Sequence, residues 1–203
     1  MGPSVDKLCL LHIVHRYTGS GPSPSQGKTR FLKELHLSVL VYRAIESGIF
    51  HGYDWAPSLV EFHGVKMYGK VSQEANADLR ALQAEKLVDK LHLSTCLYGT
   101  IRSYRSTAQA EEALAALPEE SRSSLDRLLQ CGDCGSLREI QAFIERNGGP
   151  EPRNRTVCFC PRCSRVSRRP AGTSVEGPHT DVSFFELADI VYRSRPVLPP
   201  GFL

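Results

Sequence analysis

The sequence predicts a mainly α-helical fold with a small β component, joined to a C-terminal segment organised by cysteines. Apolar residues recur at helical spacing through much of residues 1–130, and one pair of short runs there has the pattern of a β-hairpin. Five of the seven cysteines then fall between Cys131 and Cys163. We therefore expect a helical domain over residues 1–130 and a cysteine-rich, metal-binding segment over residues 131–203 that packs on it.

The composition is that of a folded protein. The chain has 203 residues, enough to bury a core, and its 41% hydrophobic and 23% charged residues lie near the averages for folded domains. The formal charge of +3 is too small to indicate nucleic-acid binding by itself, because phosphate recognition depends on clustered cations. No run reaches the roughly 20 apolar residues of a membrane span, and Asp6, Lys7 and His12 interrupt the N-terminal apolar run. We expect a cytoplasmic protein with no membrane partner.

Two helices are predicted near the N-terminus, with a loop between them. Residues Val5–Tyr17 carry apolar side chains near helical spacing, and Lys28–Glu46 has a strongly amphipathic helical pattern. The stretch Thr18–Gln26 is rich in Gly, Ser and Pro, which favours a loop. Residues Ser47–Lys70 mix aromatic residues and glycines without a clean period, so we expect irregular chain there, with a short helix near Ser58–His63.

A third helix, a hairpin and a fourth helix are expected next. A polar N-cap precedes Gln73–Lys86, where apolar residues line one helical face. Leu87–Leu93 and Tyr98–Arg105 have strand-like patterns and are separated by a short turn, which predicts a β-hairpin. A further helical pattern begins after Thr107 and continues past Pro118, where the helix is expected to kink.

Two more elements are expected in the cysteine-rich segment. Ser136 and Glu139 have the spacing of a capping box, in which the two side chains satisfy backbone amides at a helix start. The turn residues Asn147–Pro150 would end that helix. Residues Ser183–Arg193 are apolar enough to form a final strand or short helix against the core.

Two CxxC motifs predict a metal site. Cys131 and Cys134 form the first motif, and Cys160 and Cys163 form the second. Each motif can present two thiolates from a tight turn, and four sulfurs complete a tetrahedral Zn(II) site. In a reducing compartment this spacing favours metal ligation over disulfides, and an odd number of cysteines would leave one thiol unpaired. We therefore predict a structural Zn2+ ion held by these four thiolates.

Cys158 supplies a fifth thiol, two residues before Cys160. The simplest interpretation is a small buried side chain, which is where free cysteines usually lie. The alternative is that Cys158 replaces one of the four ligands, in an iron-sulfur cluster or in a redox-sensitive thiol pair, because Arg155 and Arg162 would acidify nearby thiols. Zinc is the preferred cofactor, and an iron-sulfur cluster stays open as the alternative.

Motifs for catalysis are lacking. Gly27, Lys28 and Thr29 follow a Gly-rich loop and imitate a phosphate-binding loop, but Pro22 stands where the GxxxxGK[ST] pattern requires glycine. No grouping of Ser, His, Cys or carboxylate residues has a spacing typical of nucleophilic or acid-base catalysis. We therefore expect that the protein is not an enzyme and has no small-molecule substrate.

The order of the predicted elements, three helices followed by a basic hairpin and another helix, is that of a winged helix-turn-helix. Four segments also carry a resemblance to known families: Gln26–Leu35, Tyr53–Ser58, Tyr68–Ser72 and Asp78–Leu82. Over about residues 5–145 the sequence resembles the uncharacterised YwgA-like and Panacea-type families. This resemblance implies a winged-helix protein of a kind found among prokaryotic regulators and antitoxins, to which this chain adds the cysteine motifs and a basic tail.

The helix predicted over Gln73–Lys86 is the expected reader of double-stranded DNA. Its outward face would carry amide and guanidinium groups suited to base edges, on Gln73, Asn76, Arg80 and Gln83. Contacts to the DNA backbone are predicted for arginines of the hairpin and of the basic tail: Arg102, Arg105, Arg165, Arg168 and Arg169.

Three functions stay open at this point. The leading hypothesis is a winged-helix DNA-binding transcriptional regulator with a structural zinc site. Glu74, Asp78 and Glu85 place negative charge on the helix that would face DNA, which favours instead a protein-interaction adaptor or antitoxin-like partner, with a homodimer also possible. The third hypothesis is an iron-sulfur or thiol redox sensor.

Overall fold

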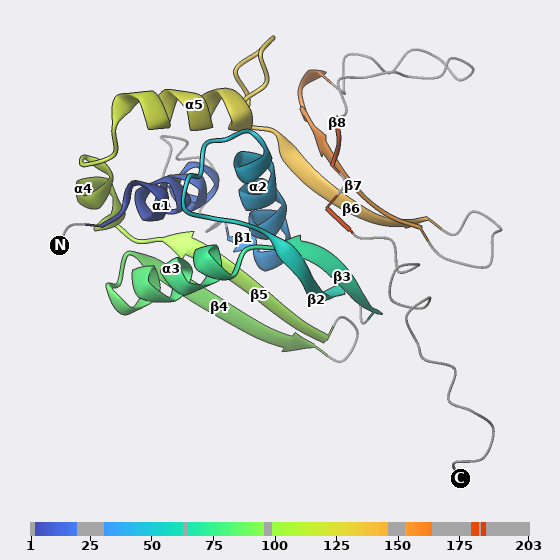
Figure 1. Cartoon of the computed structure of the whole chain (residues 1–203). Coiled ribbons are helices and arrows are strands. Elements are labelled where there is room, and N and C mark those ends of the chain that lie inside the picture. Colours follow the sequence, from blue (N-terminus) through green and yellow to red (C-terminus); the bar gives the residue numbers. More distant parts are fainter. Residues whose placement is uncertain are drawn as a thin grey trace, which may run out of the picture.

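The computed structural model describes residues 3–19, 31–62, 65–95, 99–145, 153–163, 180–182 and 184–185. Within these ranges it contains five helices and eight strands. Their order is α1 (Val5–Thr18), β1 (Leu32–Lys33), α2 (Glu34–Glu46), β2 (Ala56–Phe62), β3 (Val65–Val71), α3 (Gln73–Ala84), β4 (Val88–Thr95), β5 (Gly99–Ser106), α4 (Ala110–Leu114), α5 (Glu119–Leu129), β6 (Glu139–Glu145), β7 (Arg153–Phe159) and β8 (Thr180–Val182). Figure 1 shows the helices grouped on one side and the β6-β7 pair on the other.

The strands form three antiparallel sheets, with the orders β1-β5-β4, β2-β3 and β6-β7-β8. The predicted fold class, a mainly α winged helix-turn-helix with a small β component, was therefore wrong, and the fold is mixed α/β. Two of the three sheets come from segments where few or no strands were expected. Short strands give only a few residues of alternation each, and their pairing partners lie elsewhere in the chain, so their signal is weak.

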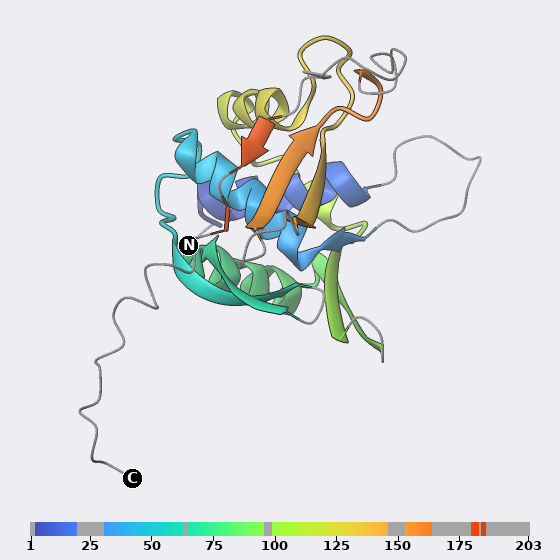
Figure 2. The ribbon, with the colours of Figure 1, turned by 90° about the vertical axis from the view of Figure 1, so that its right-hand side faces the viewer.

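Helix α1 lies at the centre of the molecule, as Figures 1 and 2 show. All residues from Leu8 to Val14 are buried, because α2, α3, α4, α5 and β5 all contact this helix. Ser4 caps its N-terminus by accepting a hydrogen bond from the backbone N–H of Lys7. The helix predicted over Val5–Tyr17 is thus confirmed, and it is buried around its whole circumference.

Other predicted elements near α1 are also confirmed. Helix α2 occupies the C-terminal part of the expected Lys28–Glu46 helix, and α3 follows the Ser72 N-cap, whose hydroxyl accepts from Ala75 N–H. The hairpin β4-β5 is present, with Asp89 paired to Arg105 in its register. The kink expected at Pro118 is a complete break between α4 and α5.

The segment before α3 was expected to be irregular with a short helix near Ser58–His63, and this was wrong. It forms the hairpin β2-β3, with Ala56 opposite Val71 and Phe62 opposite Val65. Phe184 covers the other edge of β3, where its carbonyl accepts a hydrogen bond from Lys70 N–H. The Phe184 ring also packs so closely on Gly69 that an added Cβ would lie 2.7 Å from it. Gly69 is therefore required by this close approach.

The helix expected after the Ser136–Glu139 capping-box pattern was also wrong, because this stretch continues into strand β6. Leu137 pairs with Gln130 in an isolated bridge, and Arg138 N–H donates to the Leu129 carbonyl. These bonds hold the chain antiparallel to the end of α5. The chain then continues in an extended conformation into β6. There, buried Ile140 is followed by exposed Gln141, the alternation of a half-buried strand.

Several predictions concern residues outside the described ranges. They are the Gly-rich loop with Lys28, the tail arginines Arg165, Arg168 and Arg169, and most of the expected Ser183–Arg193 element. In the part that is described, no helix is both long enough and apolar enough to cross a membrane.

Candidate metal centre

The first CxxC motif forms a tight turn directly after α5. The N–H of Cys131 donates to the Ser136 carbonyl and the N–H of Gly135 donates to the Cys131 carbonyl, both at 2.9 Å. Gly135 has a φ of +66°, a conformation that residues with a Cβ rarely adopt. The glycine after Cys134 therefore allows the chain to close this turn, which directs the thiols of Cys131 and Cys134 to one side.

The second motif lies at the end of β7. Cys160 follows the last residue of the strand, and the backbone N–H of Cys163 donates to the Cys160 sulfur at 3.5 Å. An N–H that points at a cysteine sulfur stabilises the thiolate form, which is the form that binds metals. Pairing of β7 with β6 brings this motif to the same end of the molecule as the first motif.

The four sulfur atoms converge as a metal site requires. Cys131 lies 3.8 Å from Cys163, Cys134 lies 3.4 Å from Cys160 and 3.6 Å from Cys163, and all four sulfurs lie within 4.8 Å of one another. With Zn–S bonds of about 2.3 Å, a tetrahedron has sulfur–sulfur edges of about 3.8 Å. The cluster of Cys131, Cys134, Cys160 and Cys163 can therefore hold one metal ion with little rearrangement, which confirms the predicted metal-binding capacity.

Protons are shared unequally within this cluster. Hydrogen bonds from the Ser136 hydroxyl and backbone N–H lower the pKa of Cys134 to about 6. Hydrogen bonds between its thiol and the sulfurs of Cys134, Cys160 and Cys131 raise the pKa of Cys163 to about 12. One sulfur is thus a ready thiolate and another holds a proton between its neighbours. A divalent cation would take the place of that proton, since metal binding by cysteines releases protons.

Cys158 lies apart from the cluster. Its side chain is completely buried, and its sulfur accepts a hydrogen bond of 2.8 Å from Nη1 of Arg43 on α2. Burial raises the pKa of the Cys158 thiol, while the charges of Arg43 and Arg138 oppose that rise. The structure therefore places the suggested alternate ligand in a contact between β7 and α2 instead of among the other four sulfurs.

The residues predicted to contact DNA divide between two faces. On α3, Gln73 and Arg80 are exposed, while Asn76 and Gln83 are half-buried. Arg102 on β5 forms a loose ion pair of 3.5 Å with Glu34. Arg105 pairs with Asp89 at 2.6 Å and lies over the Phe31 ring.

The register of the hairpin explains this division. Lys90 pairs with Tyr104 and His92 with Arg102, so these side chains share one face of the hairpin. Tyr104 is buried on that face, toward the helices, whereas Lys90, His92 and Arg102 are exposed. Arg105 belongs to the opposite face and so does not join them. Sequence reasoning missed Lys90 and His92, although the alternation along the predicted strand was the signal that could have found them.

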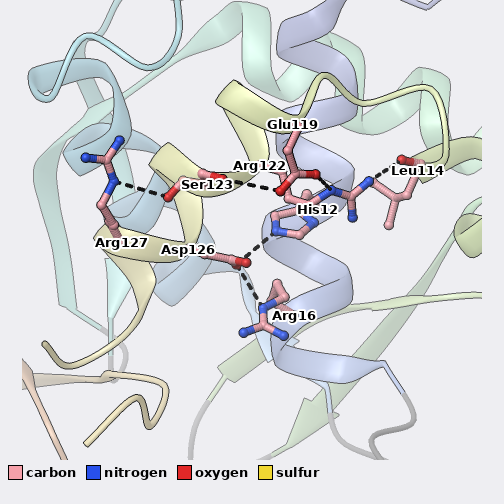
Figure 3. Close-up of polar contacts among 8 residues, drawn as sticks. All are labelled: His12, Arg16, Leu114, Glu119, Arg122, Ser123, Asp126 and Arg127. Atoms are coloured by element: carbon pink, nitrogen blue, oxygen red, sulfur yellow. Dashed lines mark hydrogen bonds and ion pairs between the residues drawn. The ribbon is translucent and has the colours of Figure 1, made fainter. Parts of the chain in front are cut away.

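The polar residues between α1 and α5 form a structural contact, shown in Figure 3. His12 Nε2 lies 3.1 Å from Oδ1 of Asp126, and Arg16 Nε lies 3.1 Å from the same oxygen. The His12 side chain is only 4% exposed and its Nδ1 has no partner in the described structure. Burial lowers the pKa of His12 more strongly than Asp126 raises it, so the ring is neutral with its proton on Nε2.

The fold and the cluster together define a mixed α/β protein with a four-cysteine centre between a helix end and a strand end. The chain belongs to the Uncharacterized protein MJ1567 family, whose model matches residues 6–146. The match includes the first CxxC motif and stops before the second. No curated protein and no solved structure matches the chain. The resemblance to YwgA-like and Panacea-type families stays a prediction, because the matched family is a different one.

Proposed function

We propose that this chain is a non-catalytic DNA-binding protein whose C-terminal sheet is held in place by one structural Zn(II) ion. The observation that carries the proposal is the convergence of four thiols from two distant turns to within 4.8 Å of one another. Four protein ligands fill the coordination shell of zinc and leave no position for a substrate or a reactive water. The centre is therefore suited to a structural role.

The distances favour one ion over a cluster. Thiolates that share a single ion are separated by one edge of its tetrahedron, about 3.8 Å for zinc. In an iron-sulfur cluster the four cysteines are divided over two or four iron atoms, so sulfurs on different irons lie farther apart than one tetrahedral edge. The separations of 3.4, 3.6 and 3.8 Å agree with the single ion.

A zinc ion at this position would join two parts of the chain. One pair of ligands follows α5, which packs on the central helix α1, and the other pair ends β7. The ion would thus fix the β6-β7-β8 sheet to the helical part of the molecule. Structural zinc contributes directly to folding free energy, because the unfolded chain has no preformed site.

The DNA-binding part of the proposal rests on exposed cations of α3 and of the hairpin. Arg80 and Lys90 are exposed and form no ion pair with any residue that the structure describes, and His92 and Arg102 share the hairpin face of Lys90. A surface with several cations on neighbouring elements suits a phosphate backbone. This interpretation needs no contribution from Arg105.

The acidic residues of α3 oppose DNA binding less than their number suggests. Asp78 accepts a hydrogen bond from Tyr53 at 2.7 Å, Glu74 accepts one from the Ser72 hydroxyl at 2.9 Å, and Glu85 pairs with Lys7. Each carboxylate is thus engaged by a neighbouring side chain. Only the charge of Glu85 is balanced by a cation, whereas the hydroxyl bonds fix the positions of Asp78 and Glu74 and leave their charges, so the support for DNA binding comes from the exposed cations.

Two measurements test the proposal. Elemental analysis and an absorption spectrum of the purified protein should give one zinc per chain and no visible colour, whereas a brown protein would indicate an iron-sulfur centre. Binding to duplex DNA should weaken steeply with salt, and Arg80→Gln with Lys90→Gln should reduce the log–log salt slope by about two. Arg105→Gln is the matched control and should leave the slope unchanged. DNA affinity that does not respond to salt would contradict the proposal, and capture of a protein without DNA binding would favour the adaptor.

A further inference from the structure

A cleft of about 350 Å3 opens between the N-terminal ends of α2 and α3, beside β2 and β5. We name it the α2–α3 cleft, and Figure 1 shows the four elements that surround it. Its volume lies within the range of roughly 300–1,000 Å3 that is typical of small-molecule sites. It lies outside the four-cysteine centre, and it is built from residues of segments that are far apart in the sequence.

Two opposite charges stand at the wall of this cleft. Arg102 and Glu34 both line it, and their ion pair is long, 3.5 Å, with side chains 48% and 40% exposed. An exposed ion pair of this kind contributes little to stability. A ligand that offers each partner a closer charge can therefore separate the two side chains at little cost.

Glu34 is nevertheless held in place on its other side. The hydroxyl of buried Tyr104 donates to Oε1 of Glu34 at 3.1 Å, while Oε2 faces Arg102. One carboxylate oxygen is thus fixed by the core, and the other remains for a ligand. The carboxylate of Glu34 is thus held in position and can still pair with a ligand through Oε2.

Apolar side chains also line the cleft, beside the polar residues Ser38, Ser58, Gln73 and Asn76. Leu59 of β2 lines it with 58% of its side chain exposed, the most exposed large hydrophobic residue in the described structure. Leu35, Val60 and Val71 line the same cleft. Burial of such surface by an apolar group of a ligand would favour binding.

We propose that the α2–α3 cleft binds a free α-amino acid with an apolar side chain. Its carboxylate would pair with Arg102, its ammonium group with Glu34, and its side chain would cover Leu59. An α-amino acid carries its ammonium and carboxylate groups on one carbon. Arg102 and Glu34 carry opposite charges 3.5 Å apart, so each can face the ligand group of opposite charge. This inference rests neither on the zinc ion nor on DNA binding.

Calorimetric titration of the intact protein tests the inference with leucine, isoleucine, valine, methionine and phenylalanine as probes. At least one should bind with a Kd below about 1 mM. Two analogues of leucine separate the charges: 4-methylpentanoate lacks the ammonium group, and 3-methylbutan-1-amine lacks the carboxylate. Because each analogue lacks one of the two charges and the charged side chains of the cleft are exposed, each should bind about threefold to fivefold more weakly than the matching amino acid.

Variants locate the binding within the cleft. Arg102→Gln and Glu34→Gln should each weaken binding by about threefold to fivefold, since each removes one of the two charges at an exposed position. Arg105→Gln is the matched control, because Arg105 lies on the same strand but on the opposite face of the hairpin. Far-UV circular dichroism of each variant establishes that it is folded.

Three results would overturn the inference. The first is that none of the five amino acids binds at about 10 mM, a concentration that reveals even weak sites. The second is equal binding of leucine and an analogue that lacks one charge. The third is an equal loss in the Arg102→Gln and Arg105→Gln variants, which would show that the binding depends on overall charge.

Discussion

Arg43 donates a hydrogen bond of 2.8 Å from Nη1 to the sulfur of Cys158, and this contact joins α2 to β7. The two residues are far apart in the sequence, and the Cys158 side chain is fully buried between the C-terminal sheet and the helical part. Arg138, next to the first cysteine motif, also acts on the same thiol. The sheet is thus attached to the body of the molecule at this contact as well as at the four-cysteine centre.

Removal of this arginine should loosen the C-terminal sheet. Arg43→Met keeps much of the side-chain volume but removes the hydrogen bond from Nη1 to the Cys158 thiol, and the free energy of unfolding should fall by about 1–2 kcal/mol. Hydrogen exchange should accelerate most in β7. Arg127→Met on the exposed face of α5 is the control, and equal losses for both variants would contradict the special role of the Arg43 contact.

Loss of a metal ligand should release the sheet but spare the core. Cys160→Ser removes one of the two buried ligands, so metal content should fall well below one ion per chain and exchange protection should drop in the segments around residues 131–145 and 153–163. Cys158→Ala is the control and should retain the metal, because its sulfur contacts Arg43 instead. Metal loss in the Cys158→Ala variant would indicate that Cys158 is a metal ligand.

Stability should decline as the pH falls from about 6.5 to about 4. Burial, aided by the charge of Lys33, lowers the pKa of His36 from 6.5 to about 4 in the folded chain. Between these values the unfolded chain binds a proton that the folded chain does not, so the neutral ring stabilises the fold above pH 6.5 and this contribution is lost as the pH falls. His36→Gln should reduce the slope of the unfolding free energy against pH by up to about 1.4 kcal/mol per pH unit.

The comparison of slopes is made by urea denaturation at several pH values. Loss of metal at low pH affects both proteins alike, so the difference between wild type and variant isolates His36. His92→Gln, a change of the same kind at an exposed position, serves as the reference variant. If His36→Gln and the wild type lose stability in parallel, His36 is not the source of the pH dependence.

A single added methyl group at Gly69 should disturb the packing of the Phe184 ring. In Gly69→Ala the new Cβ would lie 2.7 Å from the Phe184 ring and 3.3 Å from Val60, so ring and strand must separate. Overpacking of this kind costs about 1–3 kcal/mol. Gly132→Ala is the matched control, because nothing lies within 4 Å of its added Cβ. Thermal denaturation compares the two, and equal midpoints would contradict the close packing at Gly69.

The helices were predictable because their signals are local. Ser4 and Ser72 act as the N-caps that their positions before apolar runs indicate, and the pattern around Leu79 and Leu82 gives the buried face of α3. The sheets were less predictable. Strand β6 begins within a sequence that has a capping-box spacing, and its true partner, β7, contributes the decisive hydrogen bonds from elsewhere in the chain.

The four thiols of the metal centre could be predicted, whereas the surface could not. Spacing alone identified Cys131, Cys134, Cys160 and Cys163, because two CxxC turns need only to approach each other. Whether Arg102 and Arg105 are paired depends on which carboxylate lies opposite each of them. The partners are Glu34 and Asp89, and the pairing of the strands brings them into place. The α2–α3 cleft has no sequence signal, since it exists only where α2, β2 and α3 meet.

The burial of all residues from Leu8 to Val14 of α1 has a consequence for synthesis of the protein. This helix is translated before every element that covers it, and α5, one of its packing partners, emerges more than a hundred residues later. In a nascent chain the apolar residues of this helix would therefore remain uncovered until residue 129 has left the ribosome. Efficient production should depend on a chaperone that binds this segment, or on rapid translation of the chain as far as α5.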